Sequence, residues 1–167
     1  MMNAEKWIKY LDLKPHPEGG FYREMHRANS IIPNDIPGSE FKGGRNYYTS
    51  IYFLLKDDQV SHFHRICSDE IWTFHIGEPL EIHLIEKSGL HRILKLGLSI
   101  ENDEIPQHMV PANNWFGACL QNPGSFALVS CIVSPGFDFE DFELANRKQL
   151  ILEYPDLEQI IRKLTPA

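Results

Sequence analysis

Two histidines and a glutamate lie close together near the middle of the chain, in a pattern that can bind a metal. His62 and His64 flank Phe63 in an expected strand, so both imidazoles should point to the same face of the sheet. Glu70 follows at the start of the next expected strand. Two imidazoles and a carboxylate from adjacent strands can hold divalent Fe, Mn, Ni or Zn. We therefore expect His62, His64 and Glu70 to face one cavity as candidate metal ligands.

The same residues also allow acid–base chemistry without a metal. The pKa of an imidazole lies near neutral pH, so His64 can take a proton from a carbon next to a carbonyl group. A tyrosine such as Tyr52 or Tyr22 can return a proton, and Glu70 is the carboxyl group beside them. Three functions stay open: a metal-independent isomerase or epimerase, a metal-dependent enzyme, and a protein that binds a metabolite without converting it.

Four further side chains are candidates for binding a substrate. Trp72 and Phe74 share the strand face of Glu70 by parity, and aromatic walls suit a planar or sugar-like ligand. Packing in the core is the alternative role for both. Arg23 and Arg45 flank glycine-rich segments and can bind a carboxylate or phosphate, with an exposed ion pair as the alternative.

Many short strands must position these residues. Their regular spacing, with turn residues between them, is typical of an all-β sandwich or barrel of the jelly-roll type. Short helices are expected at residues 3–11 and 156–164, and a loop at residues 31–44. We expect a single domain, with a helix and strand in residues 1–27 and the barrel in residues 45–144. The expected strands are residues 21–27, 47–55, 61–64, 71–76, 80–85, 90–96, 108–110, 116–120 and 126–133.

The composition narrows the class of protein. Of 167 residues, 16 are Lys or Arg and 23 are Asp or Glu, and the net charge of −7 opposes binding to nucleic acid. Apolar runs fall far short of the roughly 20 residues of a membrane helix, and residues 1–6 lack the features of a secretory signal. Cys67, Cys119 and Cys131, without a C-x-x-C motif, fit reduced thiols. We expect a cytoplasmic protein with a small-molecule ligand and no membrane partner.

The ordered pattern from His62 to Gly77 resembles the first motif of the cupin superfamily. His64 and Glu70 stand one or two residues further apart here than in that motif, and Lys56 occupies its opening glycine position. The resemblance implies a barrel whose first motif supplies the candidate ligands already described.

The second cupin motif is only partly present, in residues 108–116. Pro111 matches it, Asn113 stands where a glycine is usual, and Phe116 stands where the third metal-binding histidine is usual. Phe116 thus removes one expected ligand and is instead a candidate substrate-binding residue. We therefore expect a divalent metal to bind weakly or partially.

A closer resemblance, covering nearly the whole chain, is to the DUF985 (cupin_5) family. It implies an RmlC-like jelly-roll cupin fold and a homodimer, and it implies little about the reaction. We expect residues 1–27 to contact the partner subunit beside the strand at residues 126–133, and the alternating acidic and aromatic residues 137–142 to form an edge or subunit contact. The segments that carry the resemblance are Leu13–Glu24, Thr49–Leu55, His64–Arg65, Ser68–Trp72 and Ser134–Leu144.

Overall fold

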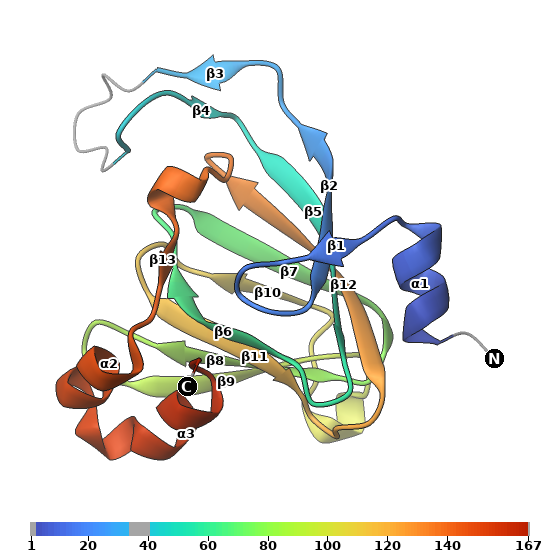
Figure 1. Ribbon diagram of the computed structural model, residues 1–167, viewed down its shortest axis with the longest axis vertical. Coiled ribbons are helices and arrows are strands. Elements are labelled where there is room, and N and C mark those ends of the chain that lie inside the picture. Colours follow the sequence, from blue (N-terminus) through green and yellow to red (C-terminus); the bar gives the residue numbers. More distant parts are fainter. Residues whose placement is uncertain (1–2, 34–40, 167) are drawn as a thin grey trace.

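Alternating apolar side chains form two β-sheets that face each other in the computed structural model, which describes residues 3–33 and 41–166 (Figure 1). All strand pairs within the sheets are antiparallel. The six-stranded sheet has the order β1 (Lys14–Pro15), β2 (Phe21–Arg27), β5 (Thr49–Lys56), β12 (Phe126–Ser134), β7 (Asp69–Gly77) and β10 (Gln107–Val110). The five-stranded sheet has the order β13 (Glu143–Leu144), β6 (Val60–Arg65), β11 (Trp115–Leu120), β8 (Leu80–Ile85) and β9 (His91–Leu96).

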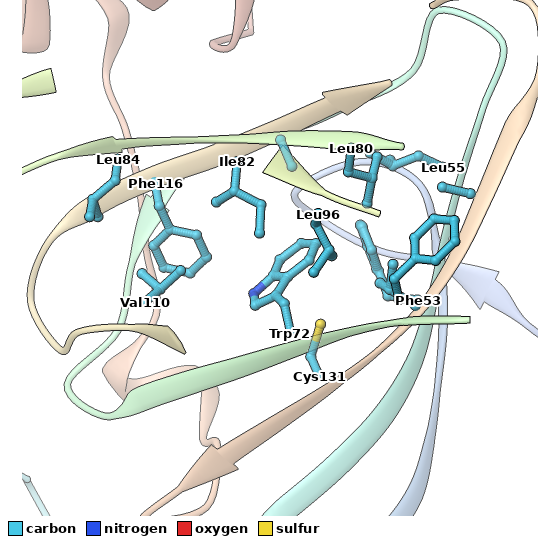
Figure 2. Packing of buried hydrophobic residues seen from close by; sticks show 14 of the residues in the cluster. Phe53, Leu55, Trp72, Leu80, Ile82, Leu84, Leu96, Val110, Phe116 and Cys131 are labelled. Atoms are coloured by element: carbon cyan, nitrogen blue, oxygen red, sulfur yellow. The ribbon is translucent and has the colours of Figure 1, made fainter. Parts of the chain in front are cut away.

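The main core lies between the two sheets. Figure 2 shows Trp72 and Cys131 on one sheet facing Phe116 and Ile82 on the other. These side chains are almost completely buried, as expected where two inner sheet faces interdigitate. The all-β architecture expected from the strand spacing is confirmed.

Short helices cover the outer face of each sheet. Helix α1 (Ala4–Tyr10) packs on the six-stranded sheet, and α2 (Arg147–Glu153) and α3 (Glu158–Lys163) pack on the five-stranded sheet (Figure 1). Helix α2 was not expected from the sequence. The expected helix at residues 156–164 begins instead with a 3-10 turn at Pro155–Leu157, before α3.

Two expectations about loops and edges need correction. Part of the expected loop at residues 31–44 is strand β3 (Ile31–Ile32), which pairs with β4 (Arg45–Asn46), and residues 34–40 lie outside the described residues. Strand β12 lies between β5 and β7, so it has no open edge beside which residues 1–27 could meet a partner subunit. A run of apolar residues such as that of β12 predicts a strand, but it does not predict which strands lie on either side of it in the sheet.

No helix of the described residues combines the length and apolar character needed to span a bilayer.

Candidate functional site

A cavity of about 410 Å³ opens between the sheets. Strands β2, β5, β6, β7 and β12 contribute to its wall, together with the segment before β2 and the segment after β12. Its lining is Asp12, Lys14, His16, Glu18, Tyr22, Arg23, Glu24, Arg27, Thr49, Ile51, Phe53, His64, Ile66, Glu70, Cys131, Val133, Phe137, Asp138 and Phe139.

A buried histidine–carboxylate pair forms part of this wall. The Nε2 atom of His64 lies 3.2 Å from Oε2 of Glu18, and Ser61 donates a hydrogen bond of 2.8 Å from its hydroxyl to Oε1 of Glu18. The Nδ1 atom of His64 lies 2.8 Å from the carbonyl oxygen of His62. Since a carbonyl can only accept, Nδ1 donates, and the lone pair of the neutral ring on Nε2 faces Glu18.

A β-bulge decides which residues of β6 reach the cavity. Phe116 pairs with His64 and Ala118 pairs with Ser61, so two residues of β6 oppose Gly117. A Cβ atom on Gly117 would lie only 2.7 Å from the carbonyl oxygen of Ser61, which explains why a glycine stands there. The bulge breaks the alternation of the strand, so Ser61 and His64 both face Glu18.

The expectation that His62 shares the cavity with His64 and Glu70 is wrong, and the bulge is the physical reason. His62 does not line the cavity. Its backbone N–H donates to the carbonyl oxygen of Glu18 at 2.8 Å, and its Nδ1 atom lies 2.7 Å from the same oxygen. His62 therefore holds the turn that carries Glu18.

The turn before β2 depends on a glycine as well. Gly19 has a φ of 111°, and a Cβ atom there would collide with the carbonyl oxygen of Val60. Only glycine can therefore bring the backbone this close to β6 in this conformation. The close approach places Glu18 beside His64.

Burial moves the pKa values of the acidic and basic groups in opposite directions. It lowers the pKa of His64 to about 4 and raises the pKa of Glu18, because burial disfavours the charged form of each group. Burial, with the nearby charge of Glu18, raises the pKa of Glu70 to about 8. Burial also lowers the pKa of His16. Near pH 7 the cavity thus holds a neutral His64 and a protonated Glu70.

The mouth of the cavity carries cationic side chains. Lys14 pairs with Asp12 at 2.6 Å, and Arg27 pairs with Glu24 at 2.7 Å. Arg23 donates to the carbonyl oxygen of Leu11 at 3.0 Å and has no carboxylate within ion-pair distance among residues 3–33 and 41–166. Its positive charge is therefore available to an anionic group of a ligand, in agreement with its sequence-based selection.

Arg45, the other candidate arginine, has a different role from the one expected. It does not line the cavity, and its guanidinium contacts the carboxylate of Asp141 through two hydrogen bonds of 2.6 and 2.8 Å. Both side chains are only 5% exposed. Asp141 ends the 3-10 turn η2 (Phe139–Asp141), so Arg45 fixes the segment that supplies Phe139 to the cavity wall.

Residues 137–142 line and back the cavity rather than only forming an edge or subunit contact. Phe137, Asp138 and Phe139 belong to the lining, and the ring of Phe142 lies 5.3 Å from that of His64. Most of this segment thus encloses the site, whereas Asp141 points to Arg45 and forms an ion pair with it.

Three aromatic candidates, Trp72, Phe74 and Phe116, belong to the core instead of the lining. Figure 2 shows Trp72 and Phe116 packed between the sheets. The ring of Phe116 lies 4.1 Å from that of His64. Strand parity places a side chain between the sheets, but it does not distinguish the packed part of that space from the open part.

Tyr52 lies on the wrong face of β5 to act with His64. It packs in the cluster beneath helix α1, where its ring lies 5.6 Å from that of His75. Phe53, the next residue, points into the space between the sheets. Tyr22, the alternative tyrosine, lines the cavity.

The cavity does not fit the metal site that a cupin barrel implies. Phe116 occupies the position of the third histidine, and His62 is held outside the lining by its contact with Glu18. Among the residues that the structure describes, the one set of three donor atoms close enough for a metal is Glu81, His83 and Cys119, on the outer face of the other sheet.

Sequence reasoning missed His16 and Glu18, the most important additions to the site. Both stand in the Leu13–Glu24 segment, where two glycines follow Glu18. The available signal in the sequence was the carboxylate of Glu18 next to two glycines, because such glycines allow two backbone segments to approach closely. Without the fold, nothing connected this segment to β6.

Comparisons with known proteins agree with this architecture. Residues 5–145 match the family described as Cupin superfamily (DUF985). Protein SO0799 from Shewanella oneidensis has a similar structure, with 40% identity, a TM-score of 0.90 and 99% coverage of both chains. A hypothetical protein from Leishmania major has 39% identity and a TM-score of 0.90, over 99% of this chain and 100% of that chain. The uncharacterized protein YML079W of Saccharomyces cerevisiae is 30% identical over 148 residues, which are 83% of this chain and 73% of that protein.

A more distant likeness is to oxalate decarboxylase from Bacillus subtilis, an enzyme with Mn(II) centers. The identity is 15% and the TM-score 0.56, over 93% of this chain and 37% of that chain. At this identity the likeness shows a shared fold alone.

Proposed function

The chain belongs to the DUF985 family of the cupin superfamily, and from this premise we propose that it binds a small metabolite between its sheets and moves a proton on it by acid–base catalysis. The ligand class is a sugar- or carboxylate-like molecule with a carbonyl group, and the reaction class is isomerisation or epimerisation. The observation that carries this proposal is the buried pair of His64 and Glu18 in the same cavity as Glu70.

The groups have complementary proton affinities. The unprotonated Nε2 atom of His64, which lies beside Glu18, accepts a proton from the carbon next to the carbonyl. The electron pair of the broken C–H bond moves toward the carbonyl oxygen, to which Glu70 gives its proton. Reversal of both transfers at the neighbouring carbon completes an isomerisation and restores both groups.

The remaining lining residues support binding. Arg23, which has no ion-pair partner among the described residues, offers its guanidinium to a carboxylate or phosphate group. Of the two candidate tyrosines, Tyr22 rather than Tyr52 is available to the ligand. We propose no counterpart of the Mn(II) centers of oxalate decarboxylase in this cavity, because no three donor atoms of the described residues that line it lie close enough together to hold one ion.

Hydrogen–deuterium exchange tests the proposal. The protein is incubated in D₂O with aldoses, ketoses and 2-oxo acids, and NMR follows exchange of the C–H next to the carbonyl. We expect exchange with at least one of them, and His64→Gln should slow it at least about a hundredfold, since a positioned base contributes about 10²–10⁴-fold. Glu18→Gln should also slow it. Tyr52→Phe is the matched control and should leave the rate unchanged.

Two outcomes would contradict the proposal. A compound that binds the cavity of the wild-type protein without exchange would indicate a metabolite-binding protein rather than an enzyme. Binding of none of the three compound classes would overturn the proposed ligand. Circular dichroism of each variant establishes that it is folded.

We also propose that the protein is a homodimer formed through β2. Strand β1 covers only Phe21 and Tyr22, and the edge of β2 from Arg23 to Arg27 has no neighbouring strand on that side among the described residues. Met25 on this strand is exposed. An open edge needs a cover, and a two-fold contact covers two such edges at once.

Sedimentation equilibrium tests the dimer. The full-length protein should sediment at twice the mass of one chain, and Met25→Lys should shift it toward the monomer by placing like charges across the two-fold axis. The control is Ile93→Lys, which changes an exposed apolar residue on β9 of the other sheet. A wild-type monomer at high concentration would refute this assembly.

We propose a cytoplasmic location because Cys119 and Cys131 form no disulfide and reducing compartments keep thiols reduced.

A further inference from the structure

A second group of chemically active side chains lies on the outer face of the five-stranded sheet, away from the cavity. Glu81 and His83 stand two residues apart on β8, so both point to the same face. Cys119 on β11 pairs directly with Glu81, and Gly117 pairs with His83. The register of two adjacent strands therefore brings a carboxylate, an imidazole and a thiol together.

The donor atoms of this group have separations suited to one metal ion. Nε2 of His83 lies 3.6 Å from Oε2 of Glu81 and 3.9 Å from Sγ of Cys119, and the three donor atoms all lie within 4.8 Å of one another. Zinc bonds of 2.0–2.3 Å at tetrahedral angles place ligand atoms about 3.3–3.8 Å apart. Small side-chain adjustments would thus complete three of four zinc ligands.

A neighbouring histidine orients His83. Its Nδ1 atom lies 3.1 Å from Nε2 of His91 on β9, and the two rings are nearly parallel, with an interplanar angle of 11°. When His83 donates from Nδ1 to His91, its Nε2 lone pair faces Glu81 and Cys119. Metal-binding histidines commonly make such a hydrogen bond through their other nitrogen.

The site already accommodates a positive charge. Lys163, at the end of α3, places its Nζ atom 3.2 Å from Sγ of Cys119. His83 and Cys119 are nearly buried, whereas Lys163 is exposed and has a long, flexible side chain. Lys163 can therefore move into solvent and leave room for a metal ion and a water molecule.

From these contacts we propose that Glu81, His83 and Cys119 form a zinc site, with His91 orienting His83 and Lys163 supplying the positive charge when the metal is absent. Thiolate, imidazole and carboxylate together favour a borderline-soft ion such as Zn²⁺ over Mg²⁺ or Ca²⁺. The ion would join β8 and β11 directly beneath α3.

Cobalt is a suitable probe because Co²⁺ occupies zinc sites and absorbs light. Untagged, full-length protein is dialysed against a chelator and titrated with Co²⁺. We expect one equivalent to produce a thiolate-to-cobalt charge-transfer band in the near ultraviolet with tetrahedral bands in the visible range, and Zn²⁺ should remove both. Absence of the charge-transfer band from the wild-type protein would overturn the proposal.

Variants assign the ligands. Cys119→Ser should abolish the charge-transfer band, and Glu81→Gln should weaken binding at least about tenfold. His91→Gln should weaken binding about 10–100-fold, and Lys163→Met should strengthen it by removing the competing ammonium. Because Glu81 is partly exposed, its variant keeps the test decisive even where Cys119→Ser disturbs folding.

Two controls locate the site. Cys67→Ser should retain the band, because Cys67 lies outside this group of donors. His64→Gln should also retain it, since His64 belongs to the cavity. A band that survives in folded Cys119→Ser, or that disappears in either control, would place the metal elsewhere and refute the assignment.

Discussion

Between pH 5 and pH 7.5, the free energy of unfolding of the wild-type protein should fall by about 3 kcal/mol relative to that of Glu70→Gln. Burial and the nearby charge of Glu18 raise the pKa of Glu70 to about 8 in the folded protein, from an ordinary value of 4.5. In this range the folded protein keeps a proton on Glu70 that the unfolded chain has released. Rising pH therefore favours unfolding, by about 1.4 kcal/mol for each pH unit.

The glutamine variant lacks this titration and keeps the shape of the side chain. The lowered pKa of His64 acts in the opposite direction, since its stability contribution is lost as pH falls from 6.5 toward about 4. This contribution is common to both proteins and cancels in the comparison.

Urea unfolding at several pH values measures the difference. The exposed Glu101→Gln serves as a control, and parallel curves for the wild type and Glu70→Gln would contradict the burial of a protonated Glu70.

Removal of the Arg45 guanidinium should lower the free energy of unfolding by about 3–5 kcal/mol, because it leaves the carboxylate of Asp141 buried without its partner. Arg45→Met keeps most of the side-chain volume and therefore isolates the charge. The variant should also bind ligands more weakly, because the released turn supplies Phe139 to the cavity wall. Chemical unfolding measures the first effect and ligand titration the second.

Glu140→Gln is the matched control for the buried pair. Glu140 contacts the same guanidinium at 3.3 Å, but its side chain is 62% exposed. An exposed ion pair contributes only about 0–1 kcal/mol, so this variant should stay close to the wild type. Equal destabilisation by Arg45→Met and Glu140→Gln would show that the burial of Asp141 does not determine the effect.

The sequence was sufficient to predict the strands and the class of fold. Runs rich in β-branched, aromatic and other apolar residues mark β5 and β12, and the residues of their inner faces do pack between the sheets. The spacing of turns between short strands favoured an all-β architecture because each strand must bury one face. These features are local, so they can be recognised without knowing which strands pair.

Part of the site followed from the same reasoning. His64 follows from residue type and strand parity, Glu70 from its place at the start of the next strand, and Arg23 from the glycine-rich segment that it flanks. All three line the cavity. Parity failed at His62 and Tyr52 for two different reasons. A bulge opposite Gly117 changed the alternation before His64, and the inner face of β5 proved to be the one that carries Phe53.

Only the tertiary structure could bring Glu18 to His64 and Arg45 to Asp141, because the members of each pair are far apart in the chain. The sequence determines which residues can ionise, whereas burial determines their pKa values and the partners that remain within reach. The pairing of β8 with β11 likewise brought Cys119 to Glu81, which no spacing along the chain indicates. Local periodicity thus specified strands, and the packing of two sheets decided which polar groups meet away from water.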